Sequence, residues 1–146
     1  MQSFRSLALA GLAVVAVVAP LGAQAAPAAQ PPAPADTLTV DWEYRANMYE
    51  GLKPGTTILV VCPPTEVTEF GTLWGTDVYT DDSAVCPAAA HAGLVDFDRG
   101  GTVVLEYLPG QESYAGSARH GVTTTEYGPW SGSFRFVVPD EEEPAG

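Results

Sequence analysis

The stretch from Trp74 to Gly93, WGTDVYTDDSAVCPAAAHAG, holds a serine, a histidine and three aspartates in one short run. These are the residue types of a nucleophilic triad, in which a histidine takes a proton from serine and an acid orients the histidine. The spacing opposes such a triad, because Ser83 and His91 are eight residues apart, which is about 12 Å along one helix. A nucleophile and its base must lie within about 3 Å of each other. The sequence therefore predicts no catalysis, and it predicts that His91 hydrogen-bonds neighbouring backbone near a helix C-terminus and fixes the following turn.

Metal binding is the other chemistry that these residue types could support. Asp77, Asp81 and Asp82 offer oxygen ligands for Ca²⁺, but an EF-hand loop alternates its ligands around a central glycine, and this spacing does not. A zinc site would need both cysteines and both histidines of the chain, with the thiols reduced. We therefore expect no metal and no cofactor, and we assign the aspartates to helix capping and a solvated acidic turn.

The N-terminal segment has the pattern of an export signal. Residues 1–25 combine an early positive charge at Arg5, an apolar run from Leu7 to Ala19 and the small-residue motif Ala23-Gln24-Ala25, which is typical of a secretory signal peptide. The apolar run is shorter than the roughly 20 residues that span a bilayer. We expect a secreted or periplasmic protein with no transmembrane segment in its mature form.

Composition divides the rest of the chain. Residues 26–36 are rich in proline and alanine and predict an extended spacer. Residues 139–146 form an acidic tail that predicts disorder. One folded domain is expected at 37–138, because this length suffices for a single hydrophobic core.

The charge balance excludes one class of partner. The chain carries 18 acidic and 6 basic residues, a net charge of −12, and loss of Arg5 with the signal leaves 18 against 5, or −13. Nucleic-acid binding depends on Lys and Arg contacts to phosphates, and no Lys/Arg cluster is present. The sequence therefore predicts no nucleic-acid partner, and it disfavours adhesion to anionic membranes.

The two cysteines, Cys62 and Cys86, favour a disulfide. An exported chain meets an oxidising environment, where an even cysteine count indicates pairing. The functional alternatives are a redox pair or a metal pair, but no C-x-x-C motif is present. Closing this loop of about 25 residues would stabilise the fold by about 3.5 kcal/mol on the chain-entropy model.

Hydrophobic patterns predict strands around one helix. Runs of β-branched and apolar residues indicate strands at 56–63, at 100–107 before a turn at Leu108–Gly110, and at 131–138. The alternating segment 38–46 predicts a further strand with one face on the core. The simplest arrangement is an α+β fold with a central helix.

That helix occupies the end of the opening stretch. Asp81, Asp82 and Ser83 are N-cap candidates, since their side chains can accept the first free N–H groups. Gly93 stands where a C-cap glycine belongs. Pro87 is comfortable only in the first turn, so the helix should begin close to it.

These motifs resemble the LCCL domain family. The resemblance is carried by VCPP, by LWGTDVYTDDSAVCPAAAHAG with Asp82, Ser83, His91 and Gly93 in register, and by GGTVVLEYLPGQESYAGSARHGVTTTEYGPWSGSFRF. It extends from about Gly55 to Val138 and implies a central α-helix wrapped by two β-sheets. It also suggests a secreted bacterial member with a single domain.

The cysteine pattern departs from that of animal members of the family. Those members carry four cysteines in two bridges, and the positions that match the other two are not cysteine here. The resemblance therefore implies that Cys62 and Cys86 pair with each other.

The resemblance implies a non-catalytic binding module for an extracellular ligand, which we expect to be a glycan, a lipopolysaccharide-like or other lipid-bearing glycan, or a protein. Aromatic residues that adjoin turns could stack on sugars, and anionic groups would need arginines. Two alternatives stay open: a small extracytoplasmic hydrolase, which a buried His91 would disfavour, and a structural envelope protein with no small ligand. The candidate ligand-binding residues are Trp74, Tyr79, Trp130, Arg99 and Arg119.

Overall fold

The structure is a computed structural model that describes Pro34 and Asp36–Val138. The expected signal peptide at 1–25, most of the spacer at 26–36 and the acidic tail at 139–146 lie outside the described residues. In the described part, no helix has the length and apolar character needed to cross a membrane.

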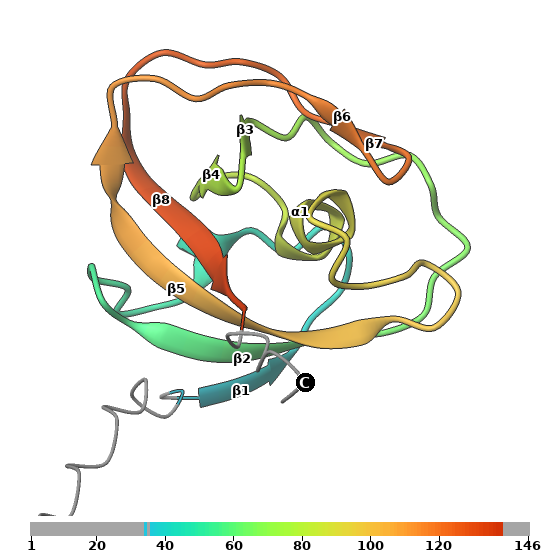
Figure 1. The fold of residues 1–146 in the computed structure, drawn as a ribbon. Coiled ribbons are helices and arrows are strands. Elements are labelled where there is room, and N and C mark those ends of the chain that lie inside the picture. The colour runs from blue at the N-terminus through green and yellow to red at the C-terminus, as the bar shows by residue number, and fades with distance from the viewer. Residues whose placement is uncertain (1–33, 35, 139–146) are drawn as a thin grey trace, which may run out of the picture. The chain divides into compact units, whose positions relative to one another are not determined.

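The main sheet has six strands in the order β1-β2-β5-β8-β4-β3 (Figure 1). Strand β1 pairs parallel with β2, and the other neighbours are antiparallel. A second, two-stranded sheet is formed by β6 and β7. The strands are β1 (Asp36–Thr39), β2 (Thr57–Cys62), β3 (Gly75–Thr76), β4 (Val78–Thr80), β5 (Gly101–Gln111), β6 (Ala118–Arg119), β7 (Val122–Thr123) and β8 (Trp130–Val137).

One α-helix, α1 (Val85–His91), lies among these strands, and all seven of its residues are buried (Figure 1). A single turn of 3-10 helix, η1 (Ala46–Met48), precedes β2. The small side chains of Ala88, Ala89 and Ala90 let neighbouring elements approach α1 closely. The prediction of an α+β fold with one central helix and two sheets is confirmed.

The N-terminus of α1 corrects the capping prediction. The helix begins at Val85 with Ala84 as N-cap, and no side chain caps it. Ala84 is extended and pairs with Arg45 in an isolated β-bridge. The Val85 N–H donates to the carbonyl of Tyr44 at 2.9 Å. Because a neighbouring segment supplies this acceptor, the first turn does not depend on a side-chain cap.

The residues predicted to cap α1 serve the turn after β4 instead. Ser83 Oγ accepts a hydrogen bond from the Trp74 N–H at 3.0 Å. Asp82 Oδ1 accepts one from Thr80 Oγ1 at 2.6 Å. These contacts fix the segment that leads into the helix, and they tie it to Trp74.

The C-terminus of α1 agrees with the sequence prediction. Gly93 follows the C-cap Ala92 and has φ of 78°. The Leu94 N–H donates to Ala89 O at 2.9 Å and the Gly93 N–H to Ala90 O at 3.0 Å. This pair of bonds is a Schellman motif, which favours glycine at the left-handed position.

Two predicted strand boundaries are wrong. The strand expected at 38–46 ends at Thr39, because Asp41 Oδ1 accepts the Glu43 N–H at 3.0 Å and turns the chain. The turn expected at Leu108–Gly110 is part of β5, where Pro109 lies opposite Gly132 of β8. The Pro109 carbonyl accepts a hydrogen bond from Ser133 Oγ at 2.7 Å, so the missing N–H of proline does not end the pairing.

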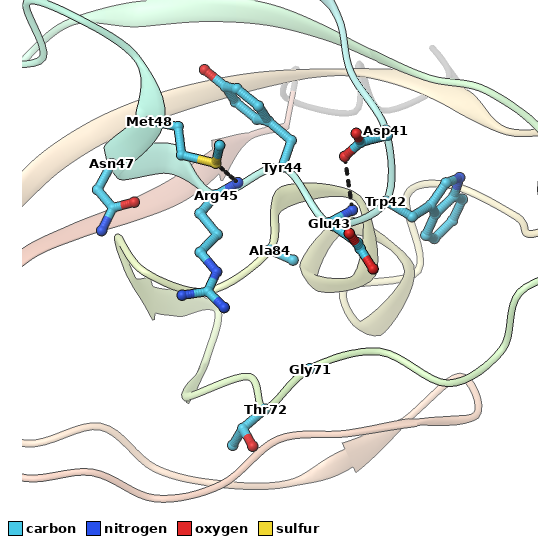
Figure 2. A pocket seen from close by; sticks show the side chains of 10 residues that line it. All are labelled: Asp41, Trp42, Glu43, Tyr44, Arg45, Asn47, Met48, Gly71, Thr72 and Ala84. Atoms are coloured by element: carbon cyan, nitrogen blue, oxygen red, sulfur yellow. Dashed lines mark hydrogen bonds between the residues drawn. The ribbon is translucent and has the colours of Figure 1, made fainter.

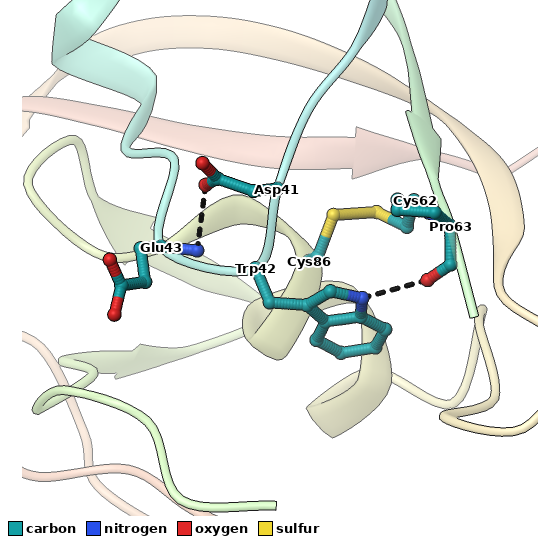
Figure 3. Close-up of a disulfide and its surroundings, with 6 residues drawn as sticks. All are labelled: Asp41, Trp42, Glu43, Cys62, Pro63 and Cys86. Carbon is teal, nitrogen blue, oxygen red and sulfur yellow. Dashed lines mark hydrogen bonds between the residues drawn. A yellow bond between two sulfur atoms is a disulfide. The ribbon is translucent and has the colours of Figure 1, made fainter. Parts of the chain in front are cut away.

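The predicted disulfide is confirmed (Figure 3). It joins Cys62, the last residue of β2, to Cys86 in the first turn of α1, with the two Cα atoms 5.7 Å apart. The Trp42 indole lies beside it and donates through Nε1 to the carbonyl of Pro63 at 2.8 Å. The bridge therefore fixes the helix against the main sheet from inside the core.

Candidate ligand-binding site

His91 is buried and hydrogen-bonded through both ring nitrogens. Its side chain has 0% exposure, its Nδ1 lies 2.9 Å from the Tyr79 hydroxyl, and its Nε2 lies 3.1 Å from Ser117 Oγ. The prediction that it bonds neighbouring backbone is wrong, because these partners are side chains of distant segments. Ser83 is engaged by Trp74 and by Thr80 at 2.9 Å. No Ser83–His91 pair is formed.

The hydrogen bonds around His91 determine its tautomer. A carbonyl can only accept, so Thr76 Oγ1 donates to Ala115 O at 2.9 Å. The Ser117 hydroxyl must then donate to Thr76 Oγ1 at 2.6 Å and accept from the Nε2–H of His91. Nδ1 of His91 is left to accept from the Tyr79 hydroxyl. Each of these polar groups therefore has a defined role in a neutral network.

Burial keeps this network neutral. Desolvation lowers the pKa of His91 below its usual value and raises the pKa of Tyr79 to about 12. At neutral pH the imidazole is uncharged and the phenol is protonated. The arrangement stabilises the packing of α1 and presents no reactive group to solvent.

Tyr79 is removed from the set of ligand-binding candidates. It has 0% exposure, and its ring stacks on Phe134 with centroids 5.6 Å apart. It belongs to β4, whose side chains at this position face the core. The turn residues near it in the sequence do not bring it to the surface.

The other two aromatic candidates belong to one surface feature, which we call the aromatic face: Trp74, Tyr127 and Trp130. Tyr127 lies between the two tryptophans, with ring centroids 5.9 Å from Trp74 and 5.8 Å from Trp130. The interplanar angles of 66° and 79° are edge-to-face arrangements, which aromatic rings favour. Tyr127 is 43% exposed, and both tryptophans are half-buried. The structure thus brings Trp74 and Trp130 together through a residue that was not predicted.

Backbone pairing holds Trp74 and Tyr127 in place. Trp74 pairs with Thr125 in an isolated bridge, and its N–H is held by Ser83 Oγ. Tyr127 exchanges both backbone hydrogen bonds with Tyr114, at 2.8 and 3.1 Å. The segment 124–129 has no regular secondary structure beyond these bridges, so no periodicity in the sequence could locate Tyr127. The only local signal is the Gly128-Pro129 turn after it.

A buried carboxylate anchors Trp130. Asp81 is 9% exposed, and its Oδ1 accepts from Trp130 Nε1 at 2.7 Å while its Oδ2 accepts from the Tyr107 hydroxyl at 2.9 Å. Gly132 permits this approach, because a Cβ there would collide with Asp81 Oδ2 and the Tyr107 hydroxyl. Burial and the bond to Asp81 raise the pKa of Tyr107 to about 12. None of the described ion pairs includes Asp81.

An open hollow of about 360 Å³ adjoins Trp130. One of its lining side chains is acidic, Glu112, and none is basic. The loop that carries Glu112 is tied to the fold, since the Gln111 N–H donates to the Tyr114 hydroxyl at 2.9 Å. The lining residues are Gly110, Gln111, Glu112, Pro129, Trp130 and Ser131.

The two arginine candidates each pair with an acid. Arg99 contacts Asp96 at 2.6 Å, and Arg119 contacts Asp77 at 2.8 Å. These pairs are exposed and therefore weak, but each guanidinium already has a neighbouring negative charge. The described contacts do not bring Arg99 and Arg119 together on one anion site.

A second hollow, of about 600 Å³, lies between the segment 41–48 and Gly71–Thr72 (Figure 2). The Arg45 side chain extends into it, and no described ion pair involves this arginine. Asp41 and Glu43 line the same hollow, so it mixes both signs of charge. We call it the Arg45 cleft. The sequence analysis missed it because the segment was predicted to be a strand.

The described residues do not form a metal-binding site. Within Pro34 and Asp36–Val138, no group of three or more His, Cys, Asp or Glu side chains is placed to hold a metal ion. Asp77 pairs with Arg119, and Asp81 is saturated by Trp130 and Tyr107.

Comparison with known proteins agrees with this fold. The sequence pattern of the LCCL domain matches residues 40–134. The chain is 37% identical to vitrin from Bos taurus over 76 residues, which are 52% of this chain and 12% of vitrin. It is 32% identical to cochlin from Bos taurus over 103 residues, 70% of this chain and 17% of cochlin. It is 33% identical to the human cysteine-rich secretory protein LCCL domain-containing 2 over 63 residues, 43% of this chain and 13% of that protein. The chain thus covers only a small part of each relative. The residues that match the LCCL pattern include α1 and both sheets except β1 and the end of β8. The chain belongs to the LCCL domain family.

Proposed function

We propose that this protein is a non-catalytic extracellular binding module and that it binds a glycan on the aromatic face. The observation that carries the proposal is the edge-to-face arrangement of Trp74, Tyr127 and Trp130, with Tyr127 exposed at its centre. Flat aromatic rings stack on the C–H faces of sugars, and Tyr and Trp lose little conformational entropy when they bind. Backbone bridges and Asp81 hold the rings before any ligand arrives, which lowers the entropic cost of binding.

The burial of His91 supports a non-catalytic role. The small-hydrolase alternative needs an exposed histidine beside an acid and a nucleophile. His91 has no exposure and is bonded to Tyr79 and Ser117. Its neutral network is complete without a substrate.

The disulfide supports an extracellular location. Structural disulfides persist in oxidising compartments such as the periplasm and the extracellular space, and Cys62 and Cys86 are bridged within the core. We therefore propose a secreted or periplasmic protein. The expectation of a bacterial, single-domain member stays a prediction.

A neutral glycan surface fits the aromatic face better than a lipopolysaccharide-like ligand does. Phosphates are bound by arginine or lysine side chains that can offer free N–H groups. Arg99 and Arg119 are paired with Asp96 and Asp77, and no basic residue lines the hollow beside Trp130. The Arg45 cleft is the place where an anionic ligand would bind instead.

To test the proposal, calorimetry would measure the binding of the purified, oxidised protein to a panel of ligands. The panel contains envelope and matrix glycans, lipid-bearing glycans and matrix proteins. Replacement of Tyr127 by alanine should lower the affinity for a bound glycan at least tenfold, about 1.4 kcal/mol, because Tyr127 contacts both tryptophans. Met48→Ala is the matched control, since Met48 is 60% exposed but lines the Arg45 cleft.

The variant that loses affinity for the glycan identifies the binding site. A glycan whose binding resists Tyr127→Ala but is lost in Met48→Ala would move the site to the Arg45 cleft. No glycan binding in the panel would contradict the proposal, and binding only to a protein would replace it with a protein-interaction role.

A further inference from the structure

Among the residues that line the hollow beside Trp130, one is acidic and none is basic. Glu112 lines the hollow beside Trp130, and neither Glu112 nor Asp81 takes part in a described ion pair. Glu126 adjoins Tyr127 in the sequence and is exposed. The described ion pairs engage Arg99, Arg119 and Arg135 with other acids. Asp81 and Glu112 thus place negative charge at Trp130, and this charge would attract a cationic ligand.

Asp81 makes the Trp130 ring a better acceptor for a cation. The indole N–H donates to a buried carboxylate at 2.7 Å, so electron density shifts from the carboxylate toward the ring. The attraction of a cation to an aromatic face depends on the negative charge of that face, and tryptophan provides the strongest such interaction among the aromatic side chains. The half-buried position of Trp130 also lowers the competition from water.

The hollow offers hydrogen-bonding groups of the right kind for an ammonium. Glu112 contributes a carboxylate, Gln111 an amide oxygen and Ser131 a hydroxyl. An ammonium can donate three hydrogen bonds. Pro129 and Trp130 supply apolar walls for the rest of a sugar ring.

We infer that the glycan bound on the aromatic face carries protonated amino groups, as in deacetylated amino sugars, and that one ammonium lies between the Trp130 ring and the Glu112 carboxylate. This inference rests on the proposed function, since it assigns a ligand class to the same site. It favours cationic glycans over neutral and anionic ones.

The test compares two oligosaccharides of equal length, fully deacetylated chitosan oligomer and its fully N-acetylated counterpart, at mildly acidic pH. We expect the deacetylated oligomer to bind about tenfold more tightly. Glu112→Gln keeps the size of the side chain and removes its charge, so it should weaken the binding of the deacetylated oligomer and abolish this preference. Glu112 is exposed, and its replacement should not affect folding.

A matched control separates a specific site from general attraction. An acidic protein of net charge −12 attracts any polycation, and Glu43→Gln removes the same charge from the Arg45 cleft. The preference should survive in Glu43→Gln. An equal loss in both variants would mean non-specific attraction and would overturn the inference.

The outcomes also distinguish this inference from the proposed function. Equal binding of both oligomers, sensitive to Tyr127→Ala, would overturn the amino-sugar preference and leave the glycan site intact. Binding of neither oligomer, with another glycan of the panel bound at Tyr127, would have the same meaning. Binding of no glycan at all would overturn both.

Discussion

At the scale of single residues, burial and hydrogen bonds to both ring nitrogens keep His91 uncharged at neutral pH. Both ring nitrogens are engaged inside the core, one with Tyr79 and one with Ser117. The acceptor role of Nδ1 is assigned by the chain of donors that ends at the Ala115 carbonyl. A second proton on the ring would meet the Tyr79 hydroxyl as a competing donor. Protonation of His91 therefore opposes the folded state.

The pKa of His91 predicts a pH dependence of stability. Burial lowers the pKa in the folded state below the unfolded value of about 6.5. Between these two pKa values the unfolded chain binds more protons at His91. The contribution of His91 to the free energy of unfolding therefore falls as the pH drops below about 6.5, and it is constant above that pH. Urea denaturation at a series of pH values measures this slope.

Two substitutions assign that slope to one histidine. In His91→Gln the slope in this range should vanish, although the variant is less stable overall because its buried partners lose their geometry. His120→Gln removes the other histidine of the chain and should keep the slope. A slope that survives in His91→Gln would show that another group is responsible.

Tyr79 and Tyr127 show that the sequence alone could not tell a buried tyrosine from an exposed one. Both adjoin turn signals, and the sequence gives no measure of which tyrosine faces the core. Tyr79 is in β4, whose pairing with β8 places it over Phe134. Tyr127 is exposed because its segment pairs only through bridges. The aromatic face depends on contacts between distant segments, and such contacts leave no local pattern.

At the scale of elements, α1 is short and is held by its surroundings more than by its own caps. The disulfide fixes its first turn, and the Schellman motif ends it. At the C-terminal end, His120 Nδ1 donates to the carbonyl of His91 at 2.9 Å, and its ring covers Gly93. The hairpin of β6 and β7 is thereby attached to the end of the helix.

Substitution of Gly93 should test this attachment. In Gly93→Ala the φ of 78° costs about 1–2 kcal/mol, and the added Cβ would lie 2.7 Å from Cε1 of His120. We expect a loss of about 2 kcal/mol or more in the free energy of unfolding, measured with urea. The loss should be smaller in a His120→Ala background, because the clash is then absent.

The control is Gly128→Ala, where no atom lies within 4 Å of the added Cβ and φ is not positive. Its stability should be close to that of the parent. Equal losses from Gly93→Ala in both backgrounds would mean that the His120 ring moves aside without cost.

The sequence patterns predicted where the main strands and the helix lie, but they did not predict all the residues at which these elements begin and end. The β-branched runs predicted β2, β5 and β8 because their side chains fill a buried sheet. The segment 38–46 alternates like a strand, but the Asp41 turn interrupts it. The N-cap was misassigned because Tyr44, far away in the sequence, supplies the partner of Val85.

At the scale of the whole molecule, charge is the dominant feature. The net charge is −12. Each described ion pair has at least one exposed partner, so these pairs contribute little stability. Like charges repel over the whole surface at low ionic strength, and this repulsion destabilises the compact state. Salt should therefore stabilise the protein.

We expect the melting temperature to rise by about 2–4 °C between low salt and physiological salt, as the Debye length falls from about 30 to about 8 Å. Differential scanning calorimetry in sodium chloride and in potassium chloride measures the change. The two salts should act equally, because screening depends on ionic strength. A falling melting temperature would show that the ion pairs outweigh the repulsion.

The parallel pairing of β1 with β2 has a mechanical consequence. One row of paired residues crosses four strands of the sheet, from β1 to β8: Asp36, Ile58, Leu105 and Phe136. Strands β1 and β8 run in the same direction. A tension that pulls on Asp36 and Val137 in opposite directions along the strands would shear the sheet. The hydrogen bonds between β1 and β2 would then be loaded together, and none could open before its neighbours. Such a sheet is expected to resist stretching along its strands.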